Sequence, residues 1–96
     1  MADNKIAKES VKREVIAGER LYTLLVYSEN VAGVLNQIAA VFTRRQVNIE
    51  SLNVSASSIE GIHKYTITAW SDAATIEKIT KQVEKKIDVI KADYYE

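Results

Sequence analysis

The first clear pattern of apolar positions along the chain has the spacing of an amphipathic helix. Its members recur at i, i+3, i+4 and i+7 and share one face: Leu35, Ile38, Ala39 and Phe42. The pattern predicts a helix from Gly33 to about Arg45. A second apolar series with the same period, Ile76, Ile79 and Val83, follows Asp72, which is a good residue to cap a helix N-terminus.

Four other stretches are typical of β-strands. Leu21–Tyr27 is apolar on both faces and suits a central strand covered on both sides. Val47–Ala56 places Val47, Ile49 and Ser51 on one face if no bulge intervenes. Ile62–Trp70 alternates apolar and polar side chains, and Ile87–Tyr95 closes the chain.

The resulting order, βαββαβ, predicts an α+β, ferredoxin-like fold. Right-handed crossovers place both helices on one face of a four-stranded antiparallel sheet, with the first and third strands in the centre. The other face is left open although it carries apolar residues, and exposed apolar surface usually marks an interface. We therefore expect the domain to form a homodimer.

Residues 1–19 carry scattered apolar positions that do not fill one face of a helix: Ile6, Val11, Val15 and Ile16. Gly18 would end any helix there. We expect a flexible N-terminal tail, because chain termini are often untied, with an ordered helix as the alternative. The folded domain is expected to cover residues 20–96.

Composition excludes several classes of function. The 96 residues suffice for one small domain, and the 13 basic and 13 acidic side chains cancel, so neither nucleic acid nor an anionic membrane is favoured as a partner. The chain has no cysteine and one histidine, His63, which cannot form a zinc site alone. No apolar run approaches the ~20 residues of a membrane span. We expect a cytoplasmic protein.

The loop before the first predicted helix is the candidate binding site. A helix N-terminus presents unpaired N–H groups and the positive end of the helix dipole, so Ser28–Gly33 could hold an anion such as an amino-acid carboxylate. From spacing alone a second interpretation stays open. Asn30 is also a common loop or cap residue, and Gly33 also permits a tight entry into a helix.

Three short motifs make the chain recognisable. They are Glu29-Asn30-x-x-Gly33-Val34-Leu35, Phe42-x-x-Arg45 and Asn48-Ile49-Glu50-Ser51-Leu52. Together they resemble the ACT domain of the regulatory small subunit of acetolactate synthase, also called acetohydroxyacid synthase. The resemblance spans roughly residues 20–95.

The resemblance implies a binding site for an amino-acid effector between two copies of the domain. Asn30 and Gly33 match residues that contact the backbone groups of the effector, and Asn48 and Ile49 match residues that complete the site from the neighbouring chain. The full set of effector-binding residues implied in this way is Asn30, Val31, Ala32, Gly33, Val34, Leu35, Asn48 and Ile49.

The resemblance also implies a function and partners. The chain would bind a branched-chain amino acid, valine before isoleucine or leucine, and convey allosteric feedback inhibition to a separate catalytic large subunit. Thiamine diphosphate, magnesium and FAD would belong to that subunit, and this chain would need no cofactor and catalyse no reaction itself. The alternative is an ACT module that regulates another enzyme of amino-acid metabolism.

Other functional classes find little support in the sequence. It contains no Gly-rich phosphate loop and no spacing typical of metal ligands. The stretch Gly61–Thr68 lacks the aromatic and basic pattern of an RNA-binding module.

The sequence departs from the family at two points. Gln46 stands where relatives often have glycine after the first helix, so that helix must end without an easy left-handed residue. Related small subunits usually continue into a second, C-terminal domain, whereas this sequence stops at Glu96, as expected of either a truncated or a short form.

Overall fold

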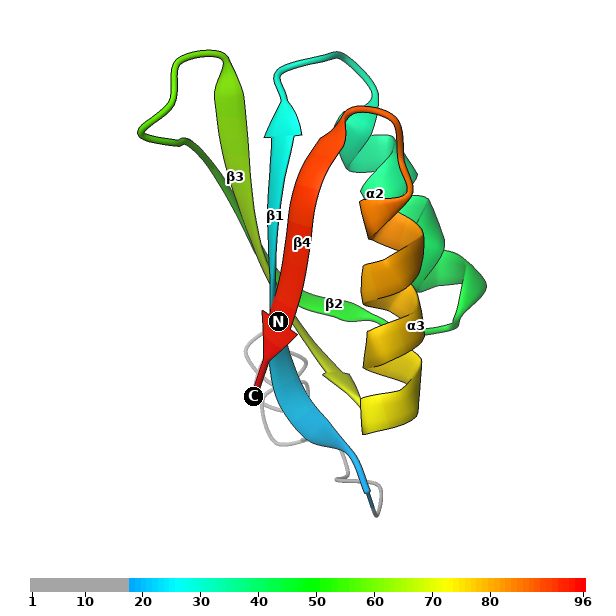
Figure 1. The fold of residues 1–96 in the computed structure, drawn as a ribbon. Helices are drawn as coiled ribbons and strands as arrows, with labels where there is room; N and C mark the ends of the chain where they lie inside the picture. Colours follow the sequence, from blue (N-terminus) through cyan, green and yellow to red (C-terminus); the bar gives the residue numbers. More distant parts are fainter. Residues whose placement is uncertain (1–17) are drawn as a thin grey trace, which may run out of the picture.

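The computed structural model describes residues 18–96 and shows a single βαββαβ unit (Figure 1). Its elements are β1 (Arg20–Glu29), α2 (Val34–Arg44), β2 (Ile49–Ala56), β3 (Ile62–Ser71), α3 (Ala73–Glu84) and β4 (Val89–Tyr95). This confirms the predicted ferredoxin-like α+β fold. The tail predicted for residues 1–19 lies, up to residue 17, outside the described residues.

The strands form one antiparallel sheet in the order β2-β3-β1-β4, which confirms β1 and β3 as the central strands. Both helices pack on the same face of this sheet (Figure 1). Consequently β2 and β4 are the edges, and one face of the sheet is left without helices.

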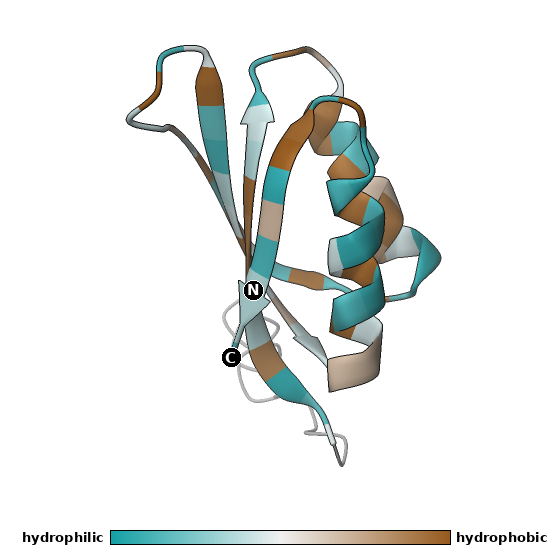
Figure 2. Cartoon of the chain, viewed as in Figure 1, coloured by the Kyte–Doolittle hydropathy of each residue, from teal (hydrophilic) through white to brown (hydrophobic). Residues whose placement is uncertain are grey.

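The core lies between the sheet and the helices, and the two central strands each contribute every second side chain to it. From the two central strands it receives Tyr22, Leu24, Val26, Tyr65, Ile67 and Ala69. From the helices it receives Val34, Ile38, Val41, Phe42, Ile76, Ile79 and Val83. Figure 2 shows brown, hydrophobic segments on the strands and on both helices.

Two expectations about burial are corrected. Leu35 was expected on the buried face of α2, but it is 38% exposed because the buried face is centred on Val34, Ile38 and Val41. β1 was expected to be covered on both sides, yet Leu21 and Leu25 on its second face stay exposed or half-exposed, because no element of residues 18–96 packs there.

The edge strand β2 differs from its prediction in both length and facing. It starts at Ile49 rather than Val47, and its pairing with β3 shifts register between Ile49 and Ser51. Ile49 pairs with Ala69 on the helix side, whereas Ser51 pairs with Thr68 on the open side. The irregularity inserts one residue, so Ile49 and Ser51 do not share the face that an unbroken strand would give them.

The last strand also begins later than predicted, at Val89. Ile87 belongs to the preceding loop and is 90% exposed. The chain turns there through a hydrogen bond from the Val89 N–H to the Lys86 carbonyl, which leaves no room for Ile87 in the ladder.

The end of α2 confirms that a left-handed residue is needed at Gln46, which has φ 57°. Its N–H donates to the Thr43 carbonyl at 2.9 Å, and the Val47 N–H donates to the Phe42 carbonyl at 3.0 Å. These bonds satisfy the last carbonyls of the helix, but they hold a side chain in a conformation that favours glycine.

We expect Gln46→Gly to raise the free energy of unfolding by about 1 kcal/mol, because it removes the steric cost of the left-handed conformation. Urea denaturation measures the change. Gln37→Gly is the matched control, since the same replacement inside α2 should lower stability by about 1 kcal/mol. A Gln46→Gly protein no more stable than the parent would contradict the assigned strain.

Asp72 caps α3, as predicted. Its carboxylate accepts a hydrogen bond from the Thr75 N–H at 2.8 Å and another from the Thr75 hydroxyl at 2.9 Å. These two bonds favour the ionised form and lower the pKa of Asp72 from its ordinary value of 3.8.

This lowered pKa predicts a pH-dependent contribution of the cap to stability. A carboxyl group whose pKa is depressed by folding stabilises fully above its unfolded pKa and loses that effect as pH falls through the folded pKa. The stability difference between the parent and Asp72→Asn should therefore be constant near neutral pH and shrink below about pH 4. Thermal unfolding at several pH values tests this, and a difference independent of pH from 7 to 2 would count against it.

Candidate functional site

The loop between β1 and α2 is fixed in place by two neighbouring loops. The Glu29 N–H donates to the Asp88 carbonyl at 2.9 Å, and the Asn30 N–H donates to the Gly61 carbonyl at 3.1 Å. Because Asp88 precedes β4 and Gly61 precedes β3, the loop is held by backbone bonds from both sides of β1. Its position is thus set by the sheet.

Gly33 is the N-cap residue of α2 and has φ 90°, a conformation that side chains rarely adopt. No side chain caps the helix. The Val34 N–H makes a long bond of 3.4 Å to the Val31 carbonyl, and within residues 18–96 the N–H groups of Leu35 and Asn36 have no acceptor. The first turn therefore presents free donors at the positive end of the helix dipole.

The positive φ of Gly33 also changes what a mutation there can show. Space around its Cα is open, so added bulk meets nothing, but any other residue at this φ is strained. An aspartate at position 33 would then both repel an anion and disturb the helix start. Variants at Asn30 and Asn48 therefore distinguish an effect on ligand binding from an effect on folding better than a variant at Gly33 does.

The predicted site residues of the loop differ in exposure. Asn30, Val31, Ala32, Gly33 and Leu35 are exposed, so a ligand can reach them. Val34 is different, because its side chain is 1% exposed and belongs to the core. It can contribute only backbone groups to a site.

Asn48 and Ile49 lie at the other end of α2. The helix has 11 residues, so about 16 Å separates its two ends at 1.5 Å per residue. One amino acid cannot touch the loop at Asn30 and the start of β2 in the same chain. The structure thus brings together the six predicted residues of the loop and the first turn of α2, but not the two that follow α2.

Sequence reasoning missed two residues at the edge of the sheet. Leu52 pairs with Ile67 and Val54 with Tyr65, so both point to the helix side, yet they are 41% and 42% exposed. Strand alternation could have indicated them, but the irregularity before Ser51 disturbs the alternation. They give β2 an apolar, uncovered flank.

No group of three or more potential metal-ligating side chains occurs within residues 18–96. A hollow of about 280 Å³ opens between α2 and α3, away from the predicted site, and is lined mostly by polar and basic side chains. In the part of the chain that the structure describes, no helix is long and apolar enough to cross a membrane.

Comparison with known families decides how the loop and the two distant residues are to be understood. Residues 24–91 match the model of the AHAS small subunit-like ACT domain. The chain belongs to this family. The match includes all eight predicted site residues and most of the fold, and it confirms the family resemblance of the three motifs.

Several similar proteins are named acetolactate synthase small subunits. One from Methanothermobacter thermautotrophicus, named as probable, is 49% identical over 63 residues, covering 66% of this chain and 38% of the relative. The Bacillus subtilis protein is 39% identical over 74 residues, covering 76% and 42%. The chain spans less than half the length of these relatives.

Solved structures support the same assignment. The acetolactate synthase small subunit of Thermotoga maritima has a TM-score of 0.71 and 33% identity, over 78% of this chain and 47% of that chain. The ACT domain of GTP pyrophosphokinase from Chlorobium tepidum has a TM-score of 0.68 over 80% of this chain and 99% of that chain. At 18% identity, this second likeness shows the fold alone.

Proposed function

We propose that this domain binds a branched-chain amino acid, valine first, between two copies of the chain and conveys feedback inhibition to an acetolactate synthase catalytic subunit. The observation that carries the proposal is the separation of the predicted site into two halves at opposite ends of α2. Together with the family match, this separation favours a site that only a second copy completes.

The first half of the site suits the charged end of an amino acid. The free N–H groups of Leu35 and Asn36 and the dipole of α2 would hold the carboxylate. Amide side chains both donate and accept, so Asn30 and Asn48 could bind carboxylate and ammonium groups alike. Exposed Leu35 and half-buried Ile49 would surround the branched side chain.

The edge strand β2 is the surface that would join the two copies. Its outer backbone groups have no strand partner among residues 18–96, and Leu52 and Val54 expose apolar surface beside them. Antiparallel pairing of β2 with its copy is self-complementary, as a two-fold interface requires. Because the two β2 strands would run in opposite directions, the start of β2 in one copy would lie toward the end of the partner's sheet that carries its loop between β1 and α2.

Regulation would follow from this composite site. An effector that contacts both copies stabilises one arrangement of the dimer, and a catalytic subunit that binds this arrangement differently would sense the effector. Coupling energies between such sites are typically ~1–3 kcal/mol. Thiamine diphosphate, magnesium and FAD would be bound by the catalytic partner.

Calorimetric titration with valine tests the site. We expect binding to the parent chain and an affinity about two- to tenfold weaker for Asn30→Ala and for Asn48→Ala, because each loses hydrogen bonds worth ~0.5–1.5 kcal/mol. Asn53→Ala is the matched control, since Asn53 is an exposed amide on β2 outside the predicted site. Equal valine affinity in all four proteins would remove both asparagines from the site.

Sedimentation tests the edge-strand dimer. The parent chain should be dimeric at about 50 μM, within ordinary association strengths. Leu52→Glu should shift it toward monomer, because charges would face each other across the apolar flank. Ile87→Glu should not, since Ile87 lies next to β4 at the opposite edge. If the Leu52→Glu protein is as dimeric as the parent, β2 does not form the dimer interface.

A further inference from the structure

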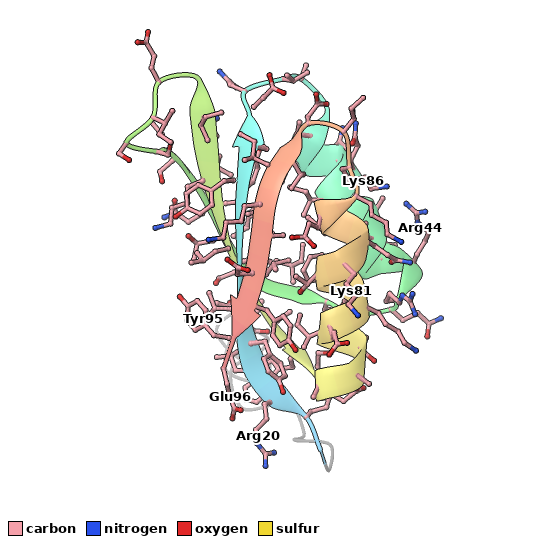
Figure 3. The ribbon with its side chains drawn as sticks, viewed as in Figure 1. Arg20, Arg44, Lys81, Lys86, Tyr95 and Glu96 are labelled. Carbon is pink, nitrogen blue, oxygen red and sulfur yellow. The ribbon has the colours of Figure 1, made fainter. Side chains whose placement is uncertain are left out.

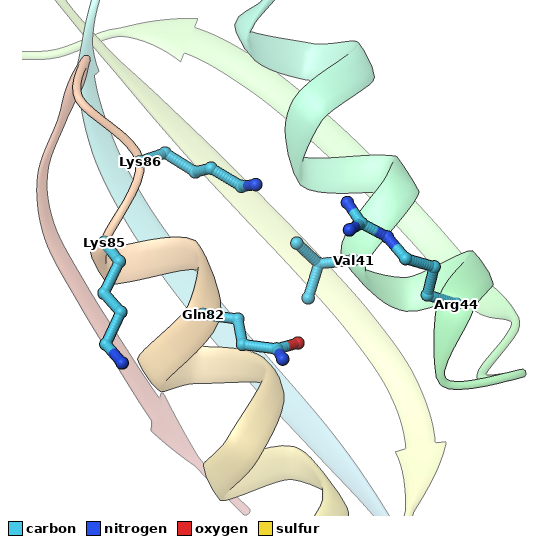
Figure 4. A pocket seen from close by; sticks show the side chains of 5 residues that line it. All are labelled: Val41, Arg44, Gln82, Lys85 and Lys86. Atoms are coloured by element: carbon cyan, nitrogen blue, oxygen red, sulfur yellow. The ribbon is translucent and has the colours of Figure 1, made fainter.

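A basic groove crosses the outer surface between the two helices. The hollow of about 280 Å³ is lined by Val41, Arg44, Gln82, Lys85 and Lys86. In Figure 4, Lys86 and Gln82 extend from the α3 side toward Val41 and Arg44 on α2. Arg45 lies beside the hollow, since its Nε donates to Oε1 of Gln82 at 3.5 Å. We call this set of six residues the basic groove.

Among residues 18–96, the cations of the groove have no anionic partner. Ion pairs among residues 18–96 join Arg20 to Glu96, Lys81 to Glu77 and Lys91 to Asp93. Within the described part of the chain, the one bond of the Arg44 side chain is a long one of 3.4 Å from its Nε to the Ala40 carbonyl. Since the whole chain has a net charge of zero, the groove is a local concentration of positive charge.

Helix capping explains only part of this arrangement. Arg44 lies in the last turn of α2 and Lys85 at the end of α3, where a cation complements the helix dipole. The interaction of a cation with a helix dipole is local to each helix. It does not explain why side chains from α2 and α3 line the same hollow. Figure 3 shows Arg44 and Lys86 on the helical side of the molecule, away from the open face of the sheet.

The chemistry of the groove favours carboxylates over a small phosphate. A small phosphate needs several donors that converge on one point, as the N–H groups of a helix N-terminus do, whereas the turns that border this groove are C-terminal. Its cations come from the last turn of α2 and from the residues that directly follow α2 and α3, around the buried side chain of Val41. Carboxylates spaced along a protein segment could each pair with one cation, with Arg44 able to bind in the bidentate manner of guanidinium groups.

We infer that the basic groove is the docking surface for a carboxylate-bearing segment of the catalytic subunit. This inference rests on the proposed function, which supplies the partner. It also gives α2 a double role. The effector loop precedes its first turn and the groove borders its last, so one rigid helix joins the two sites.

The test compares two double variants of the full chain in binding to the acetolactate synthase large subunit. Arg44→Gln with Lys86→Gln removes two cations that meet in the groove. Lys64→Gln with Lys91→Gln changes the net charge equally on β3 and β4, on the open face. We expect the dissociation constant to rise about tenfold for the groove variant and less than twofold for the control. Valine binding, measured by calorimetry, should be unchanged in both.

Each other outcome is decisive. Equal binding by the groove variant and the parent, or equal weakening in both variants, overturns the docking surface and leaves the proposed function intact. A parent chain that binds valine but not the large subunit overturns the proposed partner and this inference with it. Inorganic phosphate that displaces the large subunit more than chloride of equal ionic strength would show a phosphate site, and would also overturn the inference.

Discussion

The pairing of β1 with strands on both of its sides is the constraint on which the rest of the structure depends. It buries Leu24 and Val26 completely beneath the helices and makes β1 the axis of the sheet. The same strand ends at Glu29, whose loop is tied to the loops before β3 and β4 by backbone bonds. The start of α2, and with it the candidate effector site, is therefore positioned by the sheet rather than by the loop's own side chains.

Local rules predicted what depends on local physics. The helical period found α2 and α3, cap chemistry found Asp72, and the family motifs marked Gln46 as a position that needs a left-handed residue. The predictions that were wrong concern features that depend on tertiary packing. The register shift before Ser51 leaves no mark in a short polar strand, and Leu35 matches the helical period equally well whether it faces the core or a partner. Six candidate site residues lie in the loop before α2 and in its first turn, and the family resemblance already assigned Asn48 and Ile49 to the neighbouring chain.

In the proposed site, the separation of those two halves would link ligand binding to assembly. A ligand that needs both copies stabilises the dimer by mass action, so effector concentration and oligomeric state change together. Exposed apolar residues on β2 and the small size of the domain also favour a dimer. A domain of this size buries only about 60% of its unfolded surface and has low stability as a monomer. The helix between loop and groove would carry the effect as a rigid element.

The central claim is that the effector binds across two chains, at the start of α2 in one copy and the start of β2 in the other. Amide chemical shifts of the isotopically labelled chain, followed during titration with valine, test it most directly. The account predicts that the largest changes occur together at Gly33, Leu35 and Asn36 and at Asn48 and Ile49, although α2 separates these groups by about 16 Å within one chain. Changes confined to one of the two groups, or centred on α3, would contradict it.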